Sequence, residues 1–159
     1  MKMLALAAAA AALTTIAHAQ APAVSLKQAV ATAERVTGGK AFDAELDTER
    51  GRLVYEVSLV KDGRVVEVEI DPASGRLVRQ NRQRPAPWDF DSLKAAQSAP
   101  KPLTQTISMV EASTKGRVTD ISLEQRNRRH FYEVELAGAQ DREVLVDLQT
   151  GAITPVIDD

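Results

Sequence analysis

The chain carries the same succession of helix-like and strand-like patterns twice. In the first copy, apolar residues fall on one face of a helix at Leu26, Ala29, Val30, Ala33 and Val36. Ser25 followed by Gln28 has the spacing of a capping box, and Gly38-Gly39 provides a C-terminal stop. The pattern therefore predicts a short amphipathic helix from about residue 26.

The second copy of the helix pattern begins at Leu103. Ile107 and Val110 continue its apolar face, and Gly116 repeats the glycine stop. Pro102 stands where the first copy has its capping serine, so the sequence defines the start of this helix less sharply than that of the first.

Strand patterns follow each helix. In the first copy, Phe42, Ala44 and Leu46 alternate with polar residues, and a second alternating run follows at Leu53, Tyr55, Val57 and Leu59. Asp62-Gly63 predicts a hairpin, and Val66, Val68 and Ile70 alternate again. The turn Asp71–Gly75 leads to a short strand around Leu77. The second copy repeats this order at residues 119–124, 131–136 and 143–148 and near Ile153. We expect an α+β protein in which each repeat packs one helix on an antiparallel meander sheet of three to four strands.

The two copies also share residues at a fixed offset. Twelve identities lie 77 positions apart, among them the Tyr-Glu-Val run at Tyr55 and at Tyr132. After a one-residue deletion, Asp71 and Gly75 recur at an offset of 76 as Asp147 and Gly151. A repeat of this length indicates one supersecondary unit used twice.

The repeated residues are interpreted mainly as structural. Gly75 and Gly151 are expected to adopt a positive φ, with Asp71 and Asp147 accepting hydrogen bonds from backbone amides of the same turns. Tyr55 and Tyr132 are expected to be core tyrosines. Glu56, Glu133, Glu67 and Glu69 are expected on an exposed strand face.

The segments outside the repeats set the predicted boundaries. Lys2, the apolar stretch 3–16 and the Ala17-His18-Ala19 site have the layout of a signal peptide at residues 1–19. We expect repeat 1 at residues 20–79, a proline-rich tether at 80–101 and repeat 2 at 102–159. Trp88 and Phe90 suggest that the tether packs against a repeat, with a helical turn or two at 91–97.

Composition bears on compartment and partners. We expect a periplasmic or secreted protein without stable membrane insertion after cleavage following Ala19. The chain contains no cysteine, so we expect neither disulfides nor a lipid anchor on an N-terminal cysteine. The formal charge of −2 and 4% aromatic residues disfavour nucleic acid as a partner.

Catalytic chemistry finds no support in the sequence. Beyond the signal region the only histidine is His130, which would have to serve as the base of any serine triad. The sequence contains no phosphate loop, no dinucleotide fingerprint and no cluster of zinc ligands. We therefore predict no enzyme activity, no metal and no cofactor.

The repeated motifs resemble a known family. The leading helix, the Gly39-Lys40 and Gly116-Arg117 steps, the Tyr-Glu-Val runs and the Asp-x-x-x-Gly turns resemble the PepSY domain, found in propeptides of secreted metallopeptidases and in bacterial envelope proteins. The resemblance covers about 25–79 and 103–154. It implies a helix packed on an antiparallel sheet and a role in binding or restraining peptidases.

The functional hypothesis is a non-enzymatic exported module that binds a protein partner in the envelope, with a peptidase as the version that the family implies. The alternative is a sensor or accessory module that modulates an envelope signalling or transport protein. Selectivity is expected where the copies differ, at Arg126, Arg128, Arg129, His130, Trp88 and Phe90.

Overall fold

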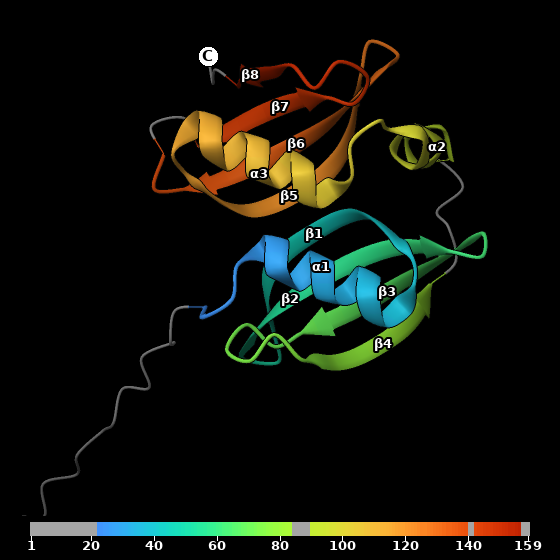
Figure 1. Cartoon of the computed structure of the whole chain (residues 1–159), viewed down its shortest axis with the longest axis vertical. Coiled ribbons are helices and arrows are strands. Elements are labelled where there is room, and N and C mark those ends of the chain that lie inside the picture. The colour runs from blue at the N-terminus through green and yellow to red at the C-terminus, as the bar shows by residue number, and fades with distance from the viewer. Residues whose placement is uncertain (1–21, 84–89, 140–141, 157–159) are drawn as a thin grey trace, which may run out of the picture.

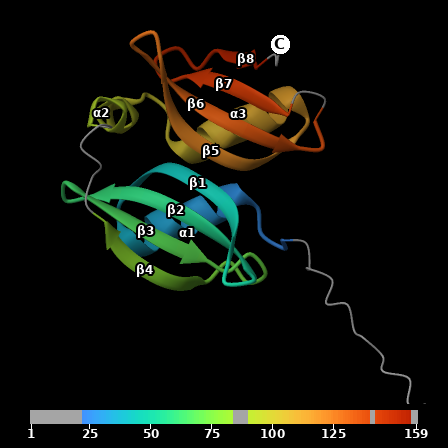
Figure 2. The ribbon, with the colours of Figure 1, turned by 180° about the vertical axis from the view of Figure 1, so that it is seen from behind.

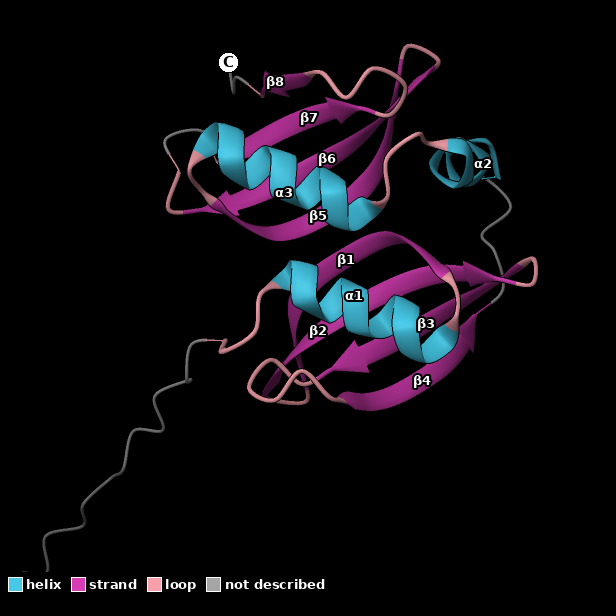
Figure 3. Cartoon of the chain, in the orientation of Figure 1, coloured by secondary structure: helices cyan, strands magenta, loops and turns pink. Residues whose placement is uncertain are grey.

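The structure is a computed structural model that describes residues 22–83, 90–139 and 142–156. Repeat 1 comprises α1 (Leu26–Thr37), β1 (Lys40–Glu49), β2 (Arg52–Lys61), β3 (Arg64–Ile70) and β4 (Leu77–Gln83). A short helix, α2 (Phe90–Ser98), follows. Repeat 2 comprises α3 (Leu103–Thr114), β5 (Arg117–Arg126), β6 (Arg129–Ala137), β7 (Glu143–Asp147) and β8 (Ile153–Pro155), as Figure 3 shows.

The strands of both repeats form one continuous antiparallel sheet. Its order is β4-β3-β2-β1-β5-β6-β7-β8, with the first strands of the two repeats paired at the centre. Helices α1 and α3 lie on the same face of this sheet (Figure 1). Seen from behind, the other face of the strands has neither of these helices in front of it (Figure 2). The predicted α+β architecture is confirmed, with four strands in each repeat.

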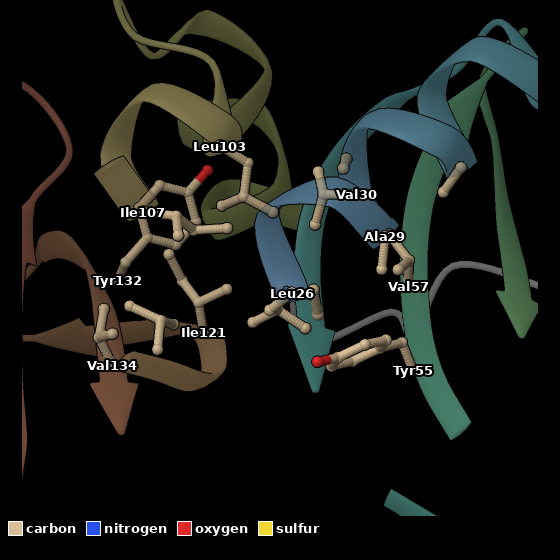
Figure 4. Close-up of a cluster of buried hydrophobic side chains, with 14 of the residues drawn as sticks. Leu26, Ala29, Val30, Tyr55, Val57, Leu103, Ile107, Ile121, Tyr132 and Val134 are labelled. Atoms are coloured by element: carbon tan, nitrogen blue, oxygen red, sulfur yellow. The ribbon is translucent and has the colours of Figure 1, made fainter. Parts of the chain in front are cut away.

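The core is shared between the repeats. One cluster of buried side chains includes Leu26 and Val30 of α1 together with Leu103 of α3 and Ile121 of β5. Figure 4 shows these side chains meeting between the two helices and the centre of the sheet. A repeat of about 50 residues buries little apolar surface alone, so joining the cores adds stability to both halves.

The helix ends follow local sequence, with one correction. Ser25 and Gln28 form the predicted capping box at the start of α1, and Gly38 closes the helix in the left-handed region (φ 72°). In α3 the left-handed position is Lys115 (φ 60°), so the prediction that Gly116 supplies the stop is wrong. A Cβ on Gly116 would lie 2.7 Å from Cβ of Ala139, so close packing explains this glycine. Val36, predicted on the buried face of α1, is 42% exposed.

The two Asp-x-x-x-Gly turns have the predicted geometry. Oδ1 of Asp71 accepts hydrogen bonds from the amides of Ala73 and Ser74, at 2.8 and 2.7 Å. Oδ1 of Asp147 does the same for residues 149 and 150, at 3.0 and 2.8 Å. Gly75 and Gly151 have φ of 70° and 73°. These hydrogen bonds favour the ionised form and hold the pKa of both carboxyls below the usual range.

A repeated glutamate has a role that the sequence pattern did not reveal. The Glu34 side chain accepts a hydrogen bond from the amide of Ala41 at 3.1 Å, and Glu111 accepts one from Val118 at 3.2 Å. Both amides lie beside an irregularity in the register, in β1 and in β5 respectively. Each helix therefore satisfies a backbone donor that the strand pairing leaves open.

The segment between the repeats is partly regular. β4 runs to Gln83, beyond the boundary predicted at residue 79, and the expected helical turns are α2. α2 contacts β1 and β5. Nζ of Lys40 donates to the carbonyl of Gln97 at 2.6 Å, and Oγ of Ser92 lies 3.2 Å from Nδ1 of His130. The second half of the predicted tether, which forms α2, thus packs over the junction of the repeats, whereas Trp88 lies outside the described residues.

Candidate functional site

A row of carboxylates crosses the sheet on the face opposite α1 and α3. It contains one residue from each of six strands that are neighbours in the sheet, in the order β3, β2, β1, β5, β6 and β7. These residues are cross-strand partners in the same order: Glu69, Glu56, Glu45, Asp120, Glu135 and Glu143. We call this row the acid ladder. Arg79 of β4 lies opposite Glu69 and ends the row.

Strand alternation places the acid ladder on the uncovered face. Val57, Ala44, Ile121 and Val134 are completely buried beneath the helices, and each directly adjoins a ladder residue in sequence. Successive side chains of a strand point to opposite faces, so the ladder residues point away from that core. Neighbouring strands lie about 4.8 Å apart, and like charges directly opposite one another destabilise a sheet. The ladder is therefore an electrostatic cost to the fold.

The cost is concentrated in the middle of the ladder. Burial, followed by repulsion from Glu67 and a hydrogen bond shared with it, raises the pKa of Glu56 to about 7. Burial, followed by repulsion from Glu45 and Glu135, raises the pKa of Asp120 to about 6. The pKa of Glu45 is raised by burial first and by neighbouring carboxylates second. Within the described part of the chain, no arginine or lysine offsets any of these three shifts.

The structure corrects the predicted exposure of three glutamates on this face. Glu69 was expected on an exposed face, yet it is 4% exposed and forms an ion pair with Arg79. Glu56 and Glu133 were expected to be solvated, and both are half-buried. Glu133 is paired with Arg126 (2.6 Å), whereas Glu56 shares its hydrogen bond with another carboxyl.

The ladder suits a cationic protein segment better than a metal ion. Among residues 22–83, 90–139 and 142–156, no group of three or more acidic or histidine side chains is arranged to hold a metal. Carboxylates spaced by the strand separation along a line do not converge on one point. The long side chains of lysine and arginine allow a basic segment that lies across the strands to reach several of these carboxylates, and partial burial strengthens each contact.

The predicted arginine cluster lies at one end of the same face. Arg126 is paired with Glu124 and Glu133, and Arg129 is paired with Asp147 and stacks over the ring of Phe131 at 5.4 Å. Arg128 occupies the tip of the β5–β6 hairpin in the left-handed region (φ 63°), is exposed, and has no ion pair with the described residues.

The cluster is therefore less available than the sequence suggested. Arg129 aligns with Arg52 of repeat 1 and fixes the turn at Asp147, which is a structural role. His130 faces Ser92 of α2. Phe90 is the first residue of α2, and its side chain, like the whole of Trp88, lies outside the described residues. The structure brings Arg126 and Arg129 together with carboxylates, whereas Arg128 has no ion pair with any residue of the described segments.

Comparison with known proteins places both repeats in one family. The family model PepSY, described as "Peptidase propeptide and YPEB domain", matches residues 23–81 and 100–154. No curated protein matches the chain. A crystal structure of a candidate lipoprotein from Clostridium difficile 630 is similar over 88% of this chain and 96% of that chain, with 16% identity and a TM-score of 0.48. Within the described residues, no helix is long and apolar enough to cross a membrane.

Proposed function

We propose that this chain, which belongs to the PepSY family, is a non-enzymatic binding module of the bacterial envelope or the extracellular space. It holds a basic segment of another protein against the open face of its sheet. A secreted or envelope peptidase is the proposed partner, in keeping with the family description as a peptidase propeptide domain.

The observation that carries this proposal is the acid ladder. Three adjacent carboxylates on β2, β1 and β5 have pKa values raised by burial and by neighbouring carboxylates, and no arginine or lysine of the described residues lowers them. Such an arrangement lowers the stability of the free protein, and a cationic partner relieves it on binding. A surface strained in the free state and relaxed in a complex is typical of a recognition surface.

The charge of this surface changes from acidic at its centre to basic at the β5–β6 hairpin. Arg126 lies at the hairpin end of β5 and Arg128 at the exposed tip of the same hairpin, whereas the centre of the open face is acidic. A partner with a basic segment flanked by an acidic group would match both parts, and the charge contacts would make its association rate dependent on salt.

The test is affinity capture from the native envelope with the mature protein as bait. The ladder variant carries Glu45→Gln, Asp120→Asn and Glu135→Gln, which keep side-chain size and remove charge. The hairpin variant carries Arg126→Ala and Arg128→Ala. The captured protein is then titrated against each variant at about 0.05 and 0.5 M salt.

The proposal predicts that the ladder variant loses most of the affinity and most of the salt dependence. Loss of affinity only in the hairpin variant would move the site to the hairpin tip and reject the ladder. For a captured peptidase, the wild-type protein should slow peptide hydrolysis and the ladder variant should not. Equal binding by all three proteins would reject both surfaces.

A further inference from the structure

The two edges of the eight-stranded sheet are built differently. At the repeat 2 edge, β8 spans only three residues and ends in Pro155, which has no N–H to donate. At the repeat 1 edge, β4 spans seven residues, Leu77–Gln83, and contains no proline. Proteins commonly protect sheet edges by shortening them or by adding proline. The β8 edge has both protections, and β4 has neither.

Most of β4 offers a regular backbone edge. Residues 79–83 pair one to one with Glu69 to Val65 of β3. Among the strands that the structure describes, β4 pairs with β3 alone, so alternate backbone groups along its other side remain available. The register shifts once, between Leu77 and Arg79, and Leu77 and Val78 are 41% and 42% exposed there. The edge thus combines free main-chain donors and acceptors with two exposed apolar side chains.

Cationic side chains surround this edge on both faces of the sheet. A hollow of about 320 Å³ beside β4 is lined by Lys61, Asp62, Arg64, Val66 and Gln80. A second hollow of about 150 Å³ is lined by Glu49, Arg50, Arg52, Glu69, Val78 and Arg79. Val66 and Gln80 belong to the helix-covered face, whereas Glu69 and Arg79 belong to the open face. Cations outnumber carboxylates in both linings.

We propose that β4 is a docking edge for an extended acidic segment of a partner protein, which adds a ninth strand to the sheet. Side chains of an added strand alternate between the two faces, so acidic residues would reach Lys61 and Arg64 on one face and Arg52 and Arg79 on the other. A second copy of this chain fits poorly, because β4 against β4 would bring the two basic borders together. This site meets the acid ladder only at Glu69 and Arg79, and the proposal does not depend on a partner bound to the ladder.

The test uses the mature full-length protein and two blocked seven-residue peptides, one alternating glutamate with valine and the other alternating lysine with valine. Binding is followed by titration, and the location by amide hydrogen exchange. The Glu peptide should slow amide exchange along residues 77–83 and leave exchange at residues 153–155 unchanged. Its binding should weaken with added salt, and the Lys peptide should not slow exchange in β4.

Two pairs of variants sharpen the assignment. The double variant Arg52→Gln with Arg64→Gln should bind the Glu peptide with about tenfold lower affinity. The matched pair Arg117→Gln with Arg142→Gln removes two exposed arginines of repeat 2 and should leave the affinity unchanged. The ladder variant should also bind this peptide normally, which separates this proposal from the proposed function. Protection at β8 alone, equal binding of both peptides, or no protection at millimolar peptide would overturn the proposal.

Discussion

Ala44 of β1 and Ile121 of β5 occupy the same position in the two repeats, 77 residues apart, and they are cross-strand partners of each other. Both are completely buried. Pairing of an element with its own equivalent is the geometry of an isologous dimer, here made within one chain. The repeats therefore meet about a local twofold axis that passes between these residues, and the edge that each repeat would otherwise expose at its first strand is covered by the other repeat.

The shared junction predicts that the two repeats unfold together. Ile121→Ala should destabilise the protein by about 2–5 kcal/mol, because it leaves a cavity in a core that both repeats line. Calorimetry should show one transition, shifted to lower temperature. The matched variant Ile153→Ala, at a partly buried position in the outermost strand, should shift it less. Two separate transitions, of which only one responds to Ile121→Ala, would contradict a common core.

The acid ladder predicts that stability falls as the pH rises from about 4 to 7. The folded-state pKa of Glu56 is about 7 and that of Asp120 about 6, above their ordinary values of 4.5 and 3.8. Because folding favours the protonated forms of these two carboxyls, they add to the stability of the folded protein at a pH below their ordinary pKa values. That added stability is lost as the pH rises through their folded-state pKa values. The lowered pKa values of Asp71 and Asp147 have the opposite effect on stability. Their stabilising contribution is present at neutral pH and is lost as the pH falls below about 4.

Melting temperatures measured between pH 5 and pH 8 test this prediction. The variant Glu56→Gln with Asp120→Asn should flatten the profile and raise the stability at pH 8 by on the order of 1 kcal/mol, after allowance for solvent screening. Glu124→Gln, outside the ladder, is the control and should leave the slope unchanged. A wild-type profile that rises across this range would show that the ladder carboxylates are not strained.

The turn at Gly75 gives a prediction that separates backbone conformation from steric contact. Gly75 has a φ of 70°, and an added Cβ would lie 3.3 Å from Cγ1 of Val24. Gly75→Ala should cost about 1 kcal/mol or more in the free energy of unfolding. Gly75→Asn adds the same Cβ but tolerates the left-handed region better, so it should cost less. Equal losses in a urea titration would assign the effect to the contact with Val24.

Export is tested by the mass of the native protein. Signal peptidase cleavage after Ala19 predicts an intact mass for residues 20–159 in the envelope or the medium. Residues 1–19 lie outside the described part of the chain, so the structure does not test this boundary. Recovery of the full 159-residue chain from the membrane fraction would contradict cleavage.

The sequence predicts local structure well and the junction not at all. Alternation at Tyr55 and Val57, the capping box at Ser25 and the turns at Asp71 and Asp147 each depend on neighbours within a few residues, so they can be derived from spacing. The acid ladder depends on which strands pair and in which register. Alternation placed Glu56 on the outer face, but nothing local indicates that Glu45 would lie beside Asp120.

The same distinction applies to the β5–β6 hairpin. The sequence shows the run of cations from Arg126 to His130, but the partners of Arg129 and His130 are distant in sequence. Arg129 pairs with Asp147, 18 residues away, and His130 with Ser92, 38 residues away. One signal did point to a structural role, since Arg129 is among the repeated residues and aligns with Arg52.

The glutamates that connect each helix to its first strand give a final prediction, which asks why these residues are repeated. The carboxylate of Glu34 accepts the amide hydrogen of Ala41, a residue only 1% exposed. Glu34→Ala leaves that buried donor without an acceptor and should cost about 1–3 kcal/mol. Glu34→Gln keeps an acceptor oxygen at the same distance along the side chain and should cost less than half as much. Glu111, which accepts from the buried amide of Val118, should show the same order of effects. Equal losses for Ala and Gln in denaturant titrations would mean that charge, rather than the hydrogen bond, explains why both repeats keep a glutamate here.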